Sequence, residues 1–93
     1  MDERREDLRM KVHVRLFASL REKLPDAERG RAILELAENG SLLDLIKRLG
    51  IEDELAQMVL RNGQPAPRAE ADRAGVVLEE GDAIAIFPPL AGG

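Results

Sequence analysis

One segment near the middle of the chain carries every local signal of a helix, and it limits the folds open to the rest. Ser41 is a favoured N-cap residue, Asp44 lies near the positive end of the helix, and Gly50 supplies the residue after its C-terminus. Apolar residues at i, i+3, i+4 and i+7 form one stripe, made of Leu42, Leu45, Ile46 and Leu49. We therefore expect a helix over 42–49 whose apolar face covers another apolar layer.

That layer is predicted by segments in which apolar and polar residues alternate, the pattern of half-buried strands. Residues 11–17 and 31–36 predict two opening strands, although Ile33 weakens the alternation of the second. Residues 58–60 and 83–87 predict two later strands. In the last strand we expect one side to carry Ile84 and Ile86, and the other side to carry Ala83, Ala85 and Phe87.

The connecting segments give weaker signals. We expect a short helical or turn segment over 18–25, a short helical turn over 52–57, and an edge strand or loop over 64–74, where two prolines limit strand pairing. A strand-like piece at 76–78 precedes a turn at 79–82. The order of elements predicts an α+β fold, a mixed sheet with one main helix packed across it, which is the ubiquitin-like β-grasp pattern.

Length and charge restrict the class of protein. The 93 residues suffice for one domain with a single core, and the 14 basic and 18 acidic residues are mixed along the chain with a net charge of −4. The absence of a basic block argues against nucleic acid as a partner. No apolar stretch reaches membrane-spanning length and the charged N-terminus lacks the apolar run of a signal peptide, so we expect a cytoplasmic protein with no membrane partner.

The scarcity of reactive side chains limits catalysis. The chain has no cysteine and one histidine, His13, which excludes a thiolate nucleophile and a metal site built from cysteine or several histidines. We therefore assign no metal-binding residue and expect His13 to be a solvated strand residue. The acidic group of Glu79, Glu80 and Asp82 is expected to form a solvated turn rather than an acid/base pair. No Gly-x-x-x-x-Gly-Lys loop for phosphate occurs, and we expect no cofactor bound by this chain and no independent catalytic site.

The C-terminal residues have an unusual composition. Pro88 and Pro89 end the last strand and hold the next residues in an extended form, because proline fixes φ and lacks an N–H group. Gly92 and Gly93 have no Cβ, so their backbone can enter a slot too narrow for other residues and present an unhindered terminal carboxylate. We divide the chain into a disordered extension (1–9), one domain (10–87) and a flexible tail (88–93).

The two aromatic residues of the chain lie close to this tail in the expected fold. If Ile84 and Ile86 face the helix, Phe87 faces outward near the start of the tail, where Phe17 can join it on the same face of the sheet. An exposed aromatic pair suits a protein interface. Packing of both rings beneath a loop is the equally weighted alternative.

A set of motifs in a fixed order identifies a family. They are Leu16-Phe17-Ala18-x-Leu20-Arg21-Glu22, Ser41-Leu42-x-Asp44-Leu45, Val59-x-x-Asn62-Gly63, Leu78-x-x-Gly81-Asp82, and Ile86-Phe87-Pro88-Pro89-Leu90-Ala91-Gly92-Gly93. From Met10 onward the chain resembles the ubiquitin-like sulfur carriers of the MoaD/ThiS family, most closely the branch of molybdopterin synthase small subunits.

The resemblance implies a carrier. An E1-like, MoeB-type adenylating partner would use ATP and Mg to activate the carboxylate of Gly93, and sulfur would then replace one oxygen to give a thiocarboxylate. The sulfur acceptor would be the MoaE-like large subunit of molybdopterin synthase. The resemblance also implies that Leu90, Ala91 and Gly92 thread into the active sites of both partners. Together with the aromatic pair and the two prolines, this gives a predicted partner-binding set made of Phe17, Phe87, Pro88, Pro89, Leu90, Ala91 and Gly92.

Three alternatives stay open at this point. The same activated carboxyl group could join Gly93 to lysines of target proteins, as in ubiquitin-like modifiers. A carrier for thiamine, cysteine or thionucleoside synthesis would have the same kind of tail. A simple adaptor with an inert tail is the third possibility.

Overall fold

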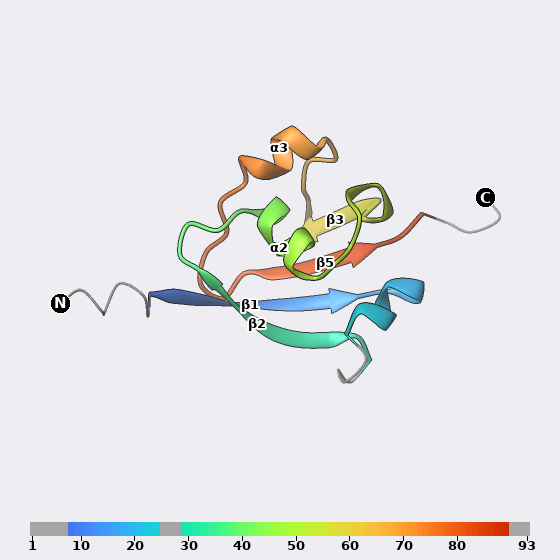
Figure 1. The fold of residues 1–93 in the computed structure, drawn as a ribbon, viewed down its shortest axis with the longest axis horizontal. Helices are drawn as coiled ribbons and strands as arrows, with labels where there is room; N and C mark the ends of the chain where they lie inside the picture. Colours follow the sequence, from blue (N-terminus) through green and yellow to red (C-terminus); the bar gives the residue numbers. More distant parts are fainter. Residues whose placement is uncertain (1–7, 25–28, 90–93) are drawn as a thin grey trace.

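The computed structural model describes residues 8–24 and 29–89, which form a mixed five-stranded sheet (Figure 1). The strand order across the sheet is β2-β1-β5-β3-β4. The central pair, β1 and β5, is parallel, and the other neighbours are antiparallel. The strands are β1 (Arg9–Leu16), β2 (Arg31–Ala37), β3 (Met58–Arg61), β4 (Gln64–Pro65) and β5 (Ala83–Phe87).

The predicted helix is present as α2 (Leu42–Arg48), which lies against one face of the sheet (Figure 1). Its start is fixed by a capping box. The Asp44 N–H donates to Ser41 Oγ at 3.0 Å, and the Ser41 N–H donates to Asp44 Oδ2 at 2.9 Å. Its end is fixed by Gly50, whose φ of 75° lies in the left-handed region that glycine tolerates.

The core lies between α2 and this face of the sheet. In β1 every second residue is buried, and the same alternation places Ile84 and Ile86 of β5 in the core, as predicted. The helix stripe expected to be buried is buried along its whole length. The sixteen apolar core residues are Met10, Val12, Val14, Leu16, Leu20, Leu36, Leu42, Leu45, Ile46, Leu49, Ile51, Ala56, Val59, Leu78, Ile84 and Ile86.

The predicted fold class is correct, whereas the segment 64–74 needs a correction. Its first two residues form the edge strand β4, but the segment also contains a helix, α3 (Glu70–Ala74). The helix is held by Arg73, whose side chain is fully buried and bonded to three distant residues. Two short 3-10 helices, η1 (Ala18–Lys23) and η2 (Asp53–Leu55), match the helical pieces expected before and after α2.

Two smaller differences concern boundaries. Strand β1 begins at Arg9, which pairs with Ala37, so the strand extends one residue into the segment expected to be a disordered extension. The strand-like piece at 76–78 contributes only an isolated bridge between Val77 and Ser41. The rest of the predicted extension, apart from Leu8, and the last four residues of the predicted tail lie outside the described residues.

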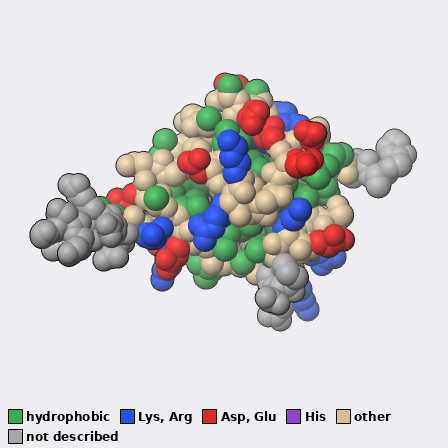
Figure 2. Space-filling model, in the orientation of Figure 1, with side chains coloured by type: hydrophobic (Ala, Val, Ile, Leu, Met, Phe, Trp, Pro, Cys, Tyr) green, Lys and Arg blue, Asp and Glu red, His purple; other side chains and the backbone are tan. Residues whose placement is uncertain are grey.

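Surface charge agrees with the mixed pattern of the sequence. Figure 2 shows acidic and basic side chains together over the face that it displays. Within the described residues, no helix combines the length and the apolar character that crossing a membrane requires.

Candidate functional site at the start of the C-terminal tail

Strand β5 carries the chain toward its C-terminus from the middle of the sheet. Ala83, Ala85 and Phe87 point to the face opposite α2, as predicted for alternate residues of this strand. Pro88 is half-buried and Pro89 is exposed, and neither belongs to the strand. The predicted site residues Leu90, Ala91, Gly92 and Gly93 lie outside the described residues, so the site is defined by the residues that surround the start of the tail.

The two phenylalanines meet at this point. Their rings are stacked, with centroids 4.1 Å apart and planes 11° apart. The pairing is a consequence of topology: Leu16 is in register with Ile86 on the parallel strands, so the next residues of both strands lie side by side. The Phe17 N–H also donates to the Ile86 carbonyl at 3.2 Å. Each ring is half-buried, so the pair keeps an exposed part.

Two further side chains extend this aromatic pair, and sequence reasoning did not include them. The Arg15 guanidinium carbon lies 4.6 Å from the centre of the Phe17 ring, a cation–π arrangement. Met58 is the cross-strand partner of Phe87 and is 47% exposed. We call Arg15, Phe17, Met58 and Phe87 the aromatic platform. Met58 could not be placed beside Phe87 from the sequence, because the register between β3 and β5 pairs these two residues across 29 positions of the chain.

The opposite end of β5 is fixed by a polar cluster around Asp82, which is 6% exposed. Its carboxylate accepts hydrogen bonds from Arg61 Nε at 3.0 Å, Asn62 Nδ2 at 3.0 Å and the Glu79 N–H at 2.8 Å. Asn62 in turn accepts from the Ala83 N–H at 2.8 Å. The predicted turn role of Asp82 is confirmed, but the expectation that its carboxylate is solvated is wrong, because Asp82 is buried and bonded to Arg61, Asn62 and Glu79. The cluster also joins the turn to β3.

The carboxylate of Asp82 is held in its charged form. Desolvation by burial alone would raise the pKa of Asp82, but the hydrogen bonds from Asn62, Glu79 and Arg61 and the charge of Arg61 outweigh it. The pKa therefore lies below its ordinary value. Glu80 of the same turn accepts a hydrogen bond from the Lys11 N–H at 2.8 Å. The Asp82 carboxylate fixes the turn that precedes β5, and the Glu80 carboxylate joins this turn to β1, so both have a structural role.

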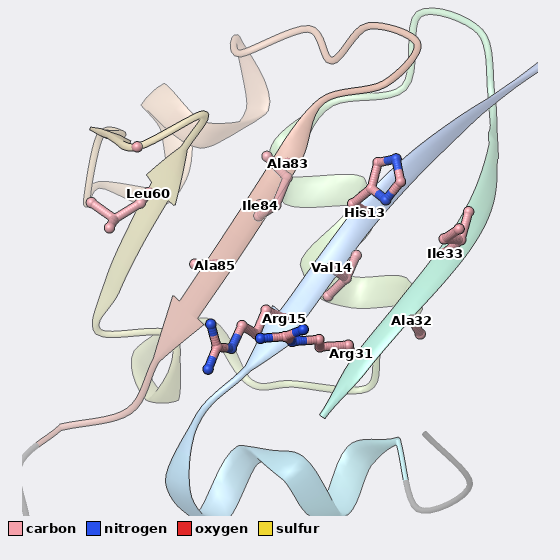
Figure 3. Close-up of a pocket in the computed structure, with 11 residues that line it drawn as sticks. His13, Val14, Arg15, Arg31, Ala32, Ile33, Leu60, Ala83, Ile84 and Ala85 are labelled. Carbon is pink, nitrogen blue, oxygen red and sulfur yellow. The ribbon is translucent and has the colours of Figure 1, made fainter. Parts of the chain in front are cut away.

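The face of the sheet opposite α2 carries a shallow groove (Figure 3). It runs across β2, β1 and β5, and its ionisable lining residues are His13, Arg15 and Arg31. The other lining residues are apolar or glycine, so the lining contains no carboxylate, hydroxyl or thiol. His13 is exposed, as expected. Among the described residues, no group of three or more His, Cys, Asp or Glu side chains is placed to hold a metal ion.

This arrangement, a central parallel pair in a five-stranded mixed sheet crossed by one helix, defines the class as a ubiquitin-like β-grasp protein. Residues 14–93 match the model of the ThiS family, which is 80 of the 93 residues, and the chain belongs to that family. Proteins of this class are ubiquitin-like sulfur carriers or modifiers that work with E1-like activating enzymes. They are in general carriers rather than catalysts.

Solved structures agree with this assignment. The Haloferax volcanii HVO 2177 protein is 26% identical, with a TM-score of 0.68, covering 91% of this chain and 88% of that one. A candidate molybdopterin converting factor, subunit 1, from Pyrococcus furiosus is 25% identical, with a TM-score of 0.63 and coverage of 87% and 99%. Small archaeal modifier protein 1 of Haloferax volcanii, 24% identical with a TM-score of 0.63 and coverage of 89% and 99%, shares the fold. A search of curated proteins found no match.

Proposed function

We propose that this protein is the sulfur-donating small subunit of molybdopterin synthase. The observation that carries the proposal is the family match, which runs through Gly92 and Gly93 and so includes the tail that would be activated. The likeness to a candidate molybdopterin converting factor subunit from Pyrococcus furiosus supports this branch of the family. The Phe-Pro-Pro ending of the strand supports it as well.

In this proposal the chemistry takes place on the terminal carboxylate of Gly93. An adenylating enzyme of the MoeB type transfers AMP from ATP, with Mg, to the carboxylate and releases pyrophosphate. Hydrosulfide then attacks the carbonyl carbon, the bond to AMP breaks, and loss of the sulfur-bound proton leaves a thiocarboxylate. The adenylate is needed because a carboxylate oxygen is a poor leaving group and AMP is a good one.

The remaining residues of the proposed site position the tail. Pro88 and Pro89 keep Leu90 and Ala91 away from the sheet, and Gly92 lets the backbone pass a narrow slot in each partner. A closed slot also keeps water from the activated carboxyl group during transfer. The sulfur would pass to the MoaE-like large subunit of the synthase.

The aromatic platform is proposed as the surface on which the partners dock. It combines two half-buried rings, an exposed thioether and a guanidinium, a composition typical of interface centres. It lies where β5 ends, so a partner that covers it meets the tail at once. Phe87 is already half-buried, so covering its remaining exposed part is expected to contribute about 0.5–2 kcal/mol to binding.

The test is the intact mass of the protein after incubation with its adenylating enzyme, ATP, Mg and a sulfur source. We expect a mass gain equal to the exchange of one oxygen for sulfur, localised to Gly93 by fragmentation. The matched control is the chain that lacks Gly92 and Gly93, which should show no gain. The loaded protein mixed with the large synthase subunit and the sulfur-free pterin precursor should then form the dithiolene product. An unchanged mass with a demonstrably active enzyme would refute the proposal.

The modifier function uses the same activated carboxyl group, and the same experiment separates the two. A modifier would form an amide between Gly93 and a lysine amino group, so the product would be a conjugate of the summed masses minus water. If conjugates that require Gly93 appear in cell extract and no thiocarboxylate forms, the protein is a modifier rather than a sulfur carrier. The fold shared with small archaeal modifier protein 1 is compatible with either outcome.

A further inference from the structure

The two edges of the sheet differ in their capacity to accept another strand. At one edge, β4 has two residues and includes Pro65, which has no N–H to donate. At the other edge, β2 has seven residues and no proline, and no strand of the described chain pairs with its outer side (Figure 1). Strand β2 is therefore the edge at which a further strand can be added.

The register with β1 shows which backbone groups of β2 point outward. The Leu16 N–H donates to the Gly30 carbonyl at 2.8 Å, and the Glu38 N–H donates to the Leu8 carbonyl at 3.4 Å. Because bonding direction alternates along an antiparallel strand, even-numbered residues of β2 face β1 and odd-numbered residues face outward. Arg31, Ile33 and Glu35 thus present their N–H and C=O groups at the free edge.

One of these outward groups already has a described partner. Arg48 of α2 donates from Nη1 to the Glu35 carbonyl at 3.0 Å. A carbonyl oxygen has two lone pairs, so this bond leaves room for a second donor. Arg48 therefore occupies one acceptor position at the Glu35 end of the β2 edge, and this edge can still pair with another strand.

The side chains of the same three residues lie on the face opposite α2. Ile33 is 59% exposed, the largest exposed fraction among the large apolar residues of the described chain. Arg31 is the cross-strand partner of Arg15, and Figure 3 shows the two side chains next to one another. Like charges directly opposite each other destabilise a strand pair, so a carboxylate placed beside Arg31 would be favourable.

We propose that two copies of this chain associate by antiparallel pairing of β2 with β2, about a two-fold axis at Ile33. In this arrangement Ile33 faces Ile33 of the second copy. Arg31 of each copy faces Glu35 of the other, which places a carboxylate beside the arginine pair. On the opposite face, Ala32 of each copy lies opposite Leu34 of the other.

The sequence of the edge favours a second copy over an unrelated strand. Arg31-x-Ile33-x-Glu35 is self-complementary when reversed: the apolar residue pairs with itself and the opposite charges pair with each other. All three backbone pairs are of the hydrogen-bonded type, because their groups point outward. The contact involves one strand from each copy, so we expect a weak dimer that depends on concentration.

The dimer and the proposed sulfur function do not depend on each other. Phe87 and Met58 of the aromatic platform belong to β5 and β3, which are separated from the β2 edge by β1, whereas Arg15 lies in β1 beside Arg31. A partner can therefore reach the two rings and Met58 while the β2 edges are paired. Failure of the dimer experiment would leave the carrier proposal intact, and the reverse is also true.

The test is sedimentation equilibrium of the full chain from about 10 µM to about 1 mM, the range suited to a weak interface. We expect the average mass to rise from monomer toward dimer. Arg31→Glu and Glu35→Arg should each weaken association about tenfold or more, because each creates two like-charge pairs. The double variant R31E/E35R should restore it, which a general loss of solubility or structure would not do.

Two further measurements locate the interface. Ile33→Lys should abolish association, whereas the control Leu55→Lys, at another exposed apolar position, should not. At high concentration the amides of Ile33 and Glu35 should gain protection from hydrogen exchange, while that of Leu34, which faces β1, should change little. Monomer at all concentrations, or a double variant that fails to restore association while circular dichroism shows it folded, would overturn the proposal.

Discussion

The substitution of Arg73 by methionine gives the sharpest test of how the helix side of the fold is held together. Arg73 lies in α3 and is fully buried. Its side chain joins α3 to η2, to the residue that follows η2 and to the loop that precedes α3. Its Nη1 donates to Asp53 Oδ1 at 2.8 Å, its Nε to the Pro67 carbonyl at 2.9 Å, and its Nη2 to the Ala56 carbonyl at 2.7 Å. Methionine keeps much of the volume and removes every donor.

The expected cost depends on which groups are left unpaired. The Ala56 carbonyl, whose bond to Arg73 is buried, loses its donor at a cost of about 1–3 kcal/mol. The bond to the Pro67 carbonyl is only partly buried and Pro67 is exposed, so water replaces part of that loss. Asp53 loses its buried partner but keeps a contact with Arg68 at 3.2 Å and is 21% exposed, so water replaces part of the loss. We expect Arg73→Met to lower the free energy of unfolding by about 3–5 kcal/mol, a large share of the roughly 5–15 kcal/mol typical of a domain.

Arg68→Met is the matched control, since Arg68 contacts the same carboxylate. Its side chain is 44% exposed, and its removal should cost less than about 1 kcal/mol. Urea unfolding at pH 7, followed by circular dichroism, measures both variants under identical conditions. If Arg73→Met is within about 1 kcal/mol of Arg68→Met, the assignment of α3 docking to the buried guanidinium is wrong.

Three further predictions concern acid stability, the tail and the platform. The pKa values of Asp53 and Asp82 are lowered in the fold, so their contribution to stability is present above the unfolded pKa of about 4 and is lost as the pH falls through the lower folded pKa values. Urea titrations from pH 7 to pH 2 should show this loss of stability, and the loss should be smaller in Asp82→Asn. Gly92→Val should leave the unfolding midpoint unchanged and abolish the thiocarboxylate mass gain, and loading at the normal rate would disprove the narrow-slot argument. Phe87→Ala should weaken binding of the adenylating enzyme by about 0.5–2 kcal/mol, roughly twofold to thirtyfold in Kd, while Leu55→Ala should leave Kd unchanged by calorimetry.

The parts of the fold that were predictable from sequence are those fixed by neighbouring residues. The helix start depends on Ser41 and Asp44, three positions apart, and its end on Gly50. The inward and outward sides of β5 are given by alternation within five residues. Helix α3 was missed because its support comes from Arg73 contacts 6 to 20 positions away, which no local pattern records.

The candidate site shows the same division. The placement of Phe17 and Phe87 on one face could be predicted, because each lies at the end of a strand with a clear alternation. Met58 and Arg15 could not be assigned to the site, since their proximity to the rings depends on strand register and on a side-chain conformation. Nothing in the sequence of 64–74 indicated that an arginine there would be buried.

The position of β5 explains how one short strand can serve a carrier. Its first residue is held by the cluster of Asp82 and Asn62, and its middle is bonded on both sides as the central strand of the sheet. Its last residue is supported by Phe17, because a parallel neighbour ends at the same edge. The strand is therefore fixed along its whole length, up to the two prolines. A partner that docks on the platform would meet a tail whose starting point and direction are already set, and so would spend less binding free energy on ordering it.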